Sequence, residues 1–252
     1  MTNYAVELSY DGTGFNGWQS QPGGGSVQNE VEAALRELGE SSAVYGAGRT
    51  DSGVHARAQV ANFRLGGEWE PRRLTLALNS KMSGSASVMR SAIVQDGFHA
   101  RHNAKAREYR YFIWNSSVCY PHIRPYVLWL CGSHYDWRGA ESAARLLIGR
   151  HDFRSFCRSA DCPDTTERTV SYARLVRRGD LVILRIVADS FLTNMVRIAV
   201  GNLIEIASGR RDEEWLRKLL LGGQGRIASA QTVAPSGLFL WRVFYNEKIS
   251  WS

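Results

Sequence analysis

The spacing of hydrophobic and polar residues divides the chain into short strands and amphipathic helices. In the first ten residues apolar side chains occupy alternate positions, Tyr4, Val6, Leu8 and Tyr10, which predicts an opening strand. The same reasoning predicts strands over 59–65, 87–94, 107–114, 126–131, 168–177, 181–187 and 238–245. Within 107–114 the aromatic and apolar positions Tyr109, Tyr111 and Ile113 share one face, and Arg110, Phe112 and Trp114 share the other.

Apolar residues recur at helical spacing in five other stretches. Ser26 is a candidate N-cap for a helix over 27–38, and Pro71 opens a short helix. Asp136 caps a helix that ends by Gly149, and Asp212 caps one that runs to residue 221. The longest predicted helix covers 191–207. The residues at 178–180 predict a hairpin turn, and the polar segment 158–167 predicts a loop.

Strands compatible with antiparallel pairing, mixed with helices, predict an α+β fold. We expect two similar halves, residues 1–104 and 105–252, each a mainly antiparallel sheet with helices on one face. Neither a low-complexity linker nor a short repeat separates them, so we expect the halves to share an interface.

Composition narrows the class of partner. The net charge is +7, and only four of the 31 basic residues are lysine, so 27 are arginine. Arginine's planar fork suits phosphates and bases, which favours a polyanionic partner, although an arginine-biased genome gives the same composition. The sequence shows no secretory leader and no membrane-length apolar run, so we expect a cytoplasmic protein without a membrane partner.

The four cysteines, Cys119, Cys131, Cys157 and Cys162, are scattered and fit reduced thiols. Cys157 and Cys162 lie near His151, but their spacing differs from that of paired zinc knuckles and no second pair follows. We therefore expect no metal site.

The segment 46–56 places one carboxylate in a turn that contains three glycines. Asp51 has Arg49 two residues before it and His55 four residues after it. An acid displayed beside a cation fits a catalytic nucleophile. It equally fits an Asx-turn acid that satisfies its own backbone, and the residue types alone do not decide between these two interpretations.

Three further segments carry candidate chemistry. Basic and aromatic residues interleave from 98 to 111, which fits RNA binding or a half-buried strand with a solvated basic face. Arg197 ends an apolar helical turn, where it either reaches solvent or takes a carboxylate partner such as Asp51. Leu238 begins the last strand, where it either contacts a ligand or belongs to the core.

As a set, these segments resemble the tRNA pseudouridine synthase A family, nearly from end to end. Asn194 stands where that family commonly has histidine or asparagine. The motifs that match are Tyr10-Asp11-Gly12-Thr13, Phe15-x2-Trp18-Gln19, 48–56, Phe98-His99-Ala100-Arg101, Arg107-x-Tyr109-x-Tyr111, Phe191-Leu192-x2-Met195-Val196-Arg197 and Gly237-Leu238-x-Leu240.

The resemblance implies isomerisation of uridines 38, 39 and 40 in the anticodon arm of tRNA by a homodimer, with no metal or cofactor. Asp51 would be the nucleophile, Arg197 its salt-bridge partner, and Arg49 the residue that helps to flip the base. Tyr109 would stack on the uracil and Leu238 would wall the pocket. The site would then lie in a cleft between the two halves. Attack on the sugar, attack on the base and removal of a sugar proton all fit a carboxylate.

Basic residues near Tyr109 are the candidate RNA contacts: Arg101, Lys105, Arg107 and Arg110. An alternative function is a non-catalytic RNA-binding protein, in which Asp51 serves only the turn. A third hypothesis, a metal-dependent hydrolase built on Asp51 and His55, has only two local ligands.

Overall fold

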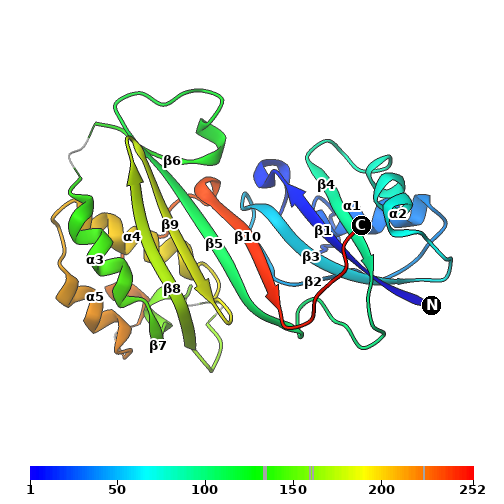
Figure 1. The fold of residues 1–252 in the computed structure, drawn as a ribbon. Coiled ribbons are helices and arrows are strands. Elements are labelled where there is room, and N and C mark those ends of the chain that lie inside the picture. Colours follow the sequence, from blue (N-terminus) through cyan, green and yellow to red (C-terminus); the bar gives the residue numbers. More distant parts are fainter. Residues whose placement is uncertain (133–134, 159, 161, 224) are drawn as a thin grey trace. The chain divides into compact units, whose positions relative to one another are not determined.

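The computed structural model describes residues 1–132, 135–158, 160, 162–223 and 225–252 (Figure 1). The chain forms two compact units: Met1–Lys105 with Phe239–Ser252, and Ala106–Leu238. Each unit contains a mostly antiparallel sheet and helices, so the α+β class predicted from the sequence is confirmed. None of the described helices is both long and apolar enough to cross a membrane.

The first unit is a sheet in the order β4-β1-β3-β10, with β2 on the edge of β3. β1 pairs antiparallel with β3 and β4, and β10 pairs parallel with β3. The strands are β1 (Thr2–Tyr10), β2 (Tyr45–Gly46), β3 (His55–Leu65), β4 (Ala86–Ile93) and β10 (Leu238–Tyr245). The helices are the short η1 (Gly12–Gly14), α1 (Val27–Glu37) and α2 (Pro71–Asn79).

Local sequence signals determine where these elements begin. The alternating residues of β1 are buried, as the period predicted. The Ser26 hydroxyl accepts a hydrogen bond from Asn29 N–H at 3.1 Å and caps α1, and Pro71 is the first residue of α2.

The closing segment belongs to the first unit, whereas the division at residue 104 placed it in the second half. Its pairing with β3 and its apolar contacts explain this difference. Tyr245, Ile249 and Trp251 pack against a buried cluster that includes Phe98 and Ala100. The Tyr245 hydroxyl also donates a hydrogen bond to Ala100 O at 2.7 Å. The residues that make these contacts are far apart in sequence, so no local sequence pattern predicts the contacts.

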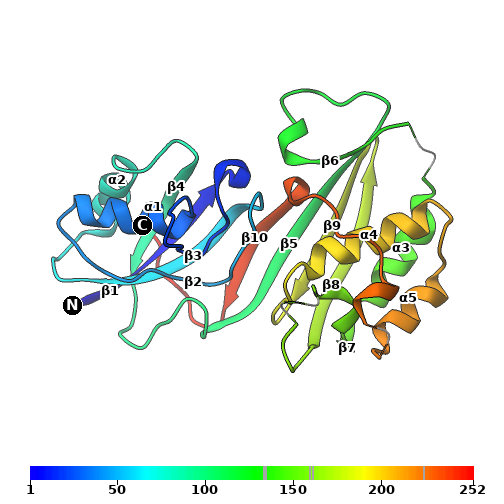
Figure 2. The same ribbon diagram turned by 180° about the vertical axis from the view of Figure 1, so that it is seen from behind.

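The second unit is a sheet in the order β5-β9-β8-β7, with β6 parallel to β5 at its end. Its strands are β5 (Ala104–Asn115), β6 (Leu128–Leu130), β7 (Gly149–Asp152), β8 (Glu167–Arg178) and β9 (Leu181–Ala188). Its helices are α3 (Trp137–Leu146), α4 (Met195–Ala207) and α5 (Glu213–Leu220). Helix α4 lies behind β8 and β9 in Figure 1 and in front of them in Figure 2.

One face of this second sheet is covered and the other is open. On β5 the covered face carries Tyr109, Tyr111 and Ile113, all buried, as their alternation predicted. Their register partners on β9, Ile186, Leu184 and Val182, are buried as well. The residues between them on β5, and their neighbours on β9 and β8, point to the opposite face of the sheet. The sequence pattern did not predict that any element covers this opposite face.

Several predicted boundaries shift. The long helix was predicted from residue 191 but begins at Met195, because Asn194 has a left-handed backbone with φ of 64°. β3 begins at His55 rather than at residue 59, and β2 and β7 were not predicted as strands. Within the predicted loop 158–167, residues 159 and 161 lie outside the described part, and 162–166 contain no helix or strand.

A buried amide pair ties the segment after β4 to the first sheet. Asn62 Nδ2 donates to Asn3 Oδ1 at 3.1 Å, and Asn62 Oδ1 accepts from Ala100 N–H at 2.9 Å. Asn3 Nδ2 donates to the carbonyls of Gln95 and Phe98, both at 2.9 Å. These bonds satisfy backbone groups that would otherwise be buried without a partner.

We predict that Asn62→Ala lowers the free energy of unfolding by about 2 to 4 kcal/mol, since it leaves Ala100 N–H and Asn3 Oδ1 buried without partners. Urea denaturation measures the change. Met89→Ala, at a position on β4 that is 56% exposed, serves as the control and should unfold like the unaltered chain. Equal stability of both variants would contradict the role given to the amide pair.

Candidate active site

The loop between β2 and β3, residues 47–54, carries Asp51 and is held in place at several points. Gln59 Nε2 on β3 donates to Gly48 O at 2.7 Å. The Tyr10 hydroxyl at the end of β1 shares a 2.8 Å hydrogen bond with Thr50 Oγ1. Burial raises the pKa of that Tyr10 phenol, so it stays neutral. The loop itself turns where Val54 N–H donates to Asp51 O at 3.1 Å.

A second set of contacts comes from the segment 12–18 after β1. Trp18 N–H donates to Thr50 O at 3.0 Å, and the Ser52 hydroxyl donates to Phe15 O at 3.2 Å. The backbone on both sides of Asp51 is therefore fixed by groups from outside the loop. The motif at residues 10–19 therefore supports the Asp51 segment, which explains why the two motifs occur together.

Two glycines allow this close approach. A Cβ on Gly17, which has φ of 81°, would lie 2.5 Å from Thr50 O. A Cβ on Gly12 would lie 2.1 Å from Val54 O. Both distances are shorter than real Cβ contacts, and the obstacle is backbone, so no side chain can be accommodated at either position.

His55 is a structural support for this loop. Its side chain is fully buried, and its Nδ1 accepts a hydrogen bond from Gly12 N–H at 3.0 Å. The same Nδ1 lies 3.2 Å from Asp11 Oδ1, so the segment after β1 contacts the ring twice. The ring stacks on Phe239 with centroids 4.6 Å apart. Among the described residues there is no group of three or more side chains placed to ligate a metal.

The two candidate residues of the loop differ in exposure. Asp51 is partly exposed and Arg49 is exposed. The anchored loop thus leaves both residues at least partly accessible to solvent. This geometry suits chemistry on a ligand that arrives from solution.

The basic segment after β4 presents its cations outward. Arg101 and Lys105 are exposed. Arg101 N–H donates to His99 Nδ1 at 3.1 Å, which fixes His99 as an acceptor. Partial burial, followed by the charge of His102, lowers the pKa of His99 and favours that neutral form.

In the second unit, Tyr109 lies on the covered face of β5 and is almost fully buried. Its ring meets Phe191 edge to face, with centroids 5.0 Å apart and planes at 81°. This contact fixes the plane of the Tyr109 ring.

Arg197 is held at the first turn of α4. Its Nη1 donates to Asn194 Oδ1 at 2.7 Å, and its Nε donates to Val233 O at 2.8 Å. Asn194 is the N-terminal flanking residue of α4, yet its side chain makes no cap hydrogen bond. Its amide instead accepts from Arg197. Asn194 is the single non-glycine with positive φ in the part of the chain that the structure describes.

Sequence reasoning missed the positioning role of Tyr111, whose alternating position indicated only core. The Tyr111 hydroxyl donates to Ala234 O at 2.6 Å, next to the Val233 carbonyl that Arg197 binds. Burial raises the pKa of Tyr111, and the charge of Arg197 opposes that rise. Tyr111 and Arg197 therefore hold the backbone that leads into Leu238. The Tyr111 hydroxyl, on an otherwise apolar face of the strand, was the sequence feature that could have indicated this role.

Leu238 is buried and follows directly on Gly237, whose added Cβ would lie 2.8 Å from the Tyr111 ring. Arg197 and Tyr111 thus bind the segment that leads into Leu238, and Tyr109 lies two residues before Tyr111 on the same face of β5. The next residue along the chain, Phe239, pairs with His55 in the first unit.

The remaining candidates on β5 have protein partners. Arg107 Nη1 donates to Asp189 O at 2.8 Å. Arg110 Nε donates to Glu108 Oε1 at 2.8 Å and lies on the open face, opposite to Tyr109. Arg110 therefore cannot contact the same part of a ligand as the Tyr109 ring.

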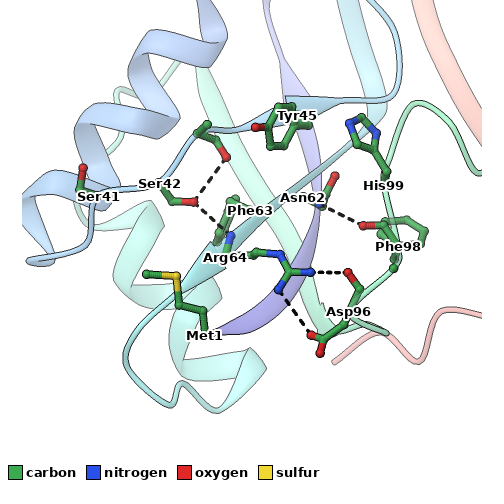
Figure 3. A pocket seen from close by; sticks show the side chains of 12 residues that line it. Met1, Ser41, Ser42, Tyr45, Asn62, Phe63, Arg64, Asp96, Phe98 and His99 are labelled. Carbon is green, nitrogen blue, oxygen red and sulfur yellow. Dashed lines mark hydrogen bonds and ion pairs between the residues drawn. The ribbon is translucent and has the colours of Figure 1, made fainter.

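A separate pocket of about 430 Å³ opens on the first unit (Figure 3). Arg64 crosses it to form an ion pair with Asp96 at 3.6 Å, and Tyr45 and His99 stand at its upper side with ring centroids 5.0 Å apart. None of the candidate site residues lines it.

Comparison with known proteins agrees with these motifs. The model of a tRNA pseudouridine synthase family matches residues 8–103 and 143–246. A tRNA pseudouridine synthase A of Brachyspira hyodysenteriae is 36% identical over 250 residues, or 98% of this chain and 100% of the relative. One of Citrifermentans bemidjiense is 38% identical over 249 residues, or 98% and 99%. A third, of Halalkalibacterium halodurans, is 38% identical over 244 residues, or 96% and 92%. The family inferred from the sequence motifs is confirmed: the chain belongs to the tRNA pseudouridine synthases.

Proposed function

We propose that this protein isomerises uridines 38, 39 and 40 of the tRNA anticodon arm to pseudouridine, with Asp51 as the nucleophile. As a family member the chain is a tRNA pseudouridine synthase, an isomerase. The reaction breaks the bond from nitrogen to the sugar, turns the base, and joins its carbon 5 to the same sugar carbon. Every atom is kept and no electron is gained or lost, so the proposal includes no cofactor.

The observation that supports this proposal most is the way Asp51 is presented. A partly exposed acid on an anchored loop suits attack on a nucleotide, because a positioned reactive group lowers the entropic cost of the step. An acid that served only its own turn would need no anchoring of Thr50 and Ser52 by other segments. The non-catalytic RNA-binding alternative has no comparable observation in its favour.

The target base must leave its stack before it reaches Asp51, which costs a few kcal/mol. We propose that the exposed Arg49 helps to extrude the base and takes its place. Tyr109, whose ring plane Phe191 fixes, stacks on the uracil, and Leu238 forms the apolar wall. Base stacking on an aromatic ring contributes about 1–3 kcal/mol, enough to offset the extrusion.

Arg197 is proposed to be the cationic partner of Asp51, so that the two units together form one catalytic cleft. A guanidinium beside a carboxylate favours its ionised form, which is the form that attacks. Asn194 and Val233 O would hold Arg197 in position for this pairing.

Phosphates of the anticodon arm are proposed to contact Arg101, Lys105, Arg107 and Arg110. We further propose that the enzyme is a homodimer and works in the cytoplasm, where its tRNA substrate is processed. Each of these assignments follows the family resemblance together with the exposure or position of the residues named.

Asp51→Asn should fold and bind tRNA normally but lose pseudouridine formation by at least about three orders of magnitude, because an amide is not a nucleophile. Mapping pseudouridine in an incubated tRNA transcript measures the loss. The matched control Asp96→Asn changes an exposed acid of the same unit and should keep full activity. Substantial activity in Asp51→Asn would overturn the proposed function.

The variant Asn194→Gly tests whether Asn194 positions Arg197, because it should change that position without lowering the stability of the fold. Glycine relieves the left-handed backbone, worth roughly 1–2 kcal/mol, but removes the acceptor of Arg197. We expect a midpoint of thermal unfolding equal to or above that of the unaltered chain, with kcat reduced on the order of tenfold or more. Asn194→Asp keeps an acceptor oxygen and should retain more activity than the glycine variant. Unchanged kcat in Asn194→Gly would show that Asn194 does not position Arg197.

A further inference from the structure

The pocket of the first unit lies away from the Asp51 loop. It is lined by residues of β2, of β3 and of the segment 96–99 (Figure 3). Tyr45 of β2 is the register partner of Asn62 on β3, whereas the Asp51 loop joins β3 at His55. At a rise of roughly 3.3 Å per residue, the strand from His55 to Asn62 spans about 23 Å. A ligand in this pocket is therefore distinct from the group that would react at Asp51.

Three aromatic rings lie in contact beside this pocket. The ring centroids of Tyr45 and His99 are 5.0 Å apart, and those of His99 and His102 are 4.2 Å apart. We call these three residues the ring cluster. Tyr45 is 49% exposed, and His102 is exposed. A tyrosine ring gains stability when its large apolar area is covered, so accessible rings beside a cavity are suited to a flat ligand that stacks on them.

Backbone contacts hold the ring cluster in place. Asn103 Oδ1 accepts from His99 N–H at 2.9 Å, and Arg101 N–H donates to His99 Nδ1 at 3.1 Å. Because Nδ1 accepts, the proton of the neutral His99 ring is assigned to Nε2, which can donate to an acceptor on a ligand. Asn62 Nδ2 donates to Phe98 O at 3.3 Å and ties the residue before His99 to β3. The pocket and its rings are thus formed before a ligand arrives.

The charges inside and outside the pocket differ. Arg64, the arginine among the lining residues, forms an ion pair with Asp96 at 3.6 Å and also donates to the Asp96 carbonyl. These contacts balance its charge, so the pocket itself does not select a free anion. Arg101 and Lys105, which follow His99 along the same segment, are exposed and are not among the lining residues. Their cations therefore lie beside the pocket.

This arrangement matches one nucleotide of an RNA strand better than a free small molecule. Rings stack on a base of any sequence, and cations beside them contact the phosphates of the same strand. The volume of about 430 Å³ falls within the range of about 300–1,000 Å³ that is typical of ligand pockets. The net charge of +7 favours a polyanion, and tRNA, on which the family acts, exposes unstacked bases in its loops.

We propose that this pocket binds an unstacked base of the tRNA other than the reacting uridine, with the base stacked on the ring cluster. Arg101 and Lys105 contact the phosphates next to that base. The pocket then contributes to the affinity for tRNA and to its placement, and not to the chemical step. The inference rests on the proposed function only in that tRNA is the substrate, and it is independent of the role of Asp51.

Tyr45→Ala tests this proposal, with Leu76→Ala as the matched control. Leu76 is a 64% exposed apolar residue on α2 of the same unit. Fluorescence anisotropy measures the Kd for a tRNA transcript and for a fully paired RNA duplex of equal length. We expect Tyr45→Ala to bind tRNA about tenfold more weakly than Leu76→Ala, because one stacked base is lost. The two variants should bind the duplex, which offers no unstacked base, within twofold of each other.

A conservative variant and turnover complete the test. Tyr45→Phe keeps the ring and should bind tRNA within twofold of the unaltered chain. The kcat of Tyr45→Ala at saturating tRNA should also stay within twofold, whereas Asp51→Asn should lose turnover at an unchanged Kd. The two proposals therefore fail separately.

Three results would overturn the pocket's assignment to a tRNA base. The first is equal tRNA affinity in Tyr45→Ala and Leu76→Ala. The second is an equal loss of tRNA and duplex binding in Tyr45→Ala, which would mean that the ring contacts the RNA backbone or supports the fold. The third is competition with tRNA by micromolar adenosine monophosphate, which would assign the pocket to a free nucleotide.

Discussion

The close approach of the 12–18 segment to the Asp51 loop is the constraint on which the candidate site depends. Gly12 and Gly17 bring two stretches of backbone together where no side chain fits. Hydrogen bonds from Trp18, Ser52 and Tyr10 then fix the loop on either side of Asp51. Because β1 and β3 supply both ends of this arrangement, the position of the acid is set by the sheet of the first unit.

In the second unit a cationic side chain, Arg197, is held by hydrogen bonds in a similar way. Arg197 and Tyr111 bind the adjacent carbonyls of Val233 and Ala234, so a helix and a strand fix one irregular segment between them. Asn194 takes a left-handed backbone and gives up the usual capping bond, and its amide binds Arg197 instead. Backbone strain of this kind persists only where surrounding contacts impose it, and it clusters at functional sites. The two units therefore each present preorganised groups on short, tightly bonded segments.

Local chemistry made much of this fold predictable. Ser26, Asp136 and Asp212 cap helices through their own side chains, and alternation alone identified the covered face of β5. The start of α4 was not predicted, because Asn194 has a left-handed backbone and its amide accepts from Arg197 instead of capping the helix. The place of the closing strand was not predictable either, because that strand pairs with β3, whose residues come much earlier in the sequence. For Asp51 the residue types left two interpretations open, and only the set of accompanying motifs indicated catalysis.

We infer from these contacts that the Asp51 loop is rigid before any RNA binds. Native-state amide hydrogen exchange of the RNA-free protein tests it most directly, at Val54 N–H and Trp18 N–H, which bond to Asp51 O and Thr50 O. If the loop is preorganised, both amides exchange as slowly as those at the centre of β1 and β3, since all open in the same unit. Rapid exchange at Val54 and Trp18, with the strands still protected, would contradict a preformed loop and show that Asp51 is positioned only when RNA binds.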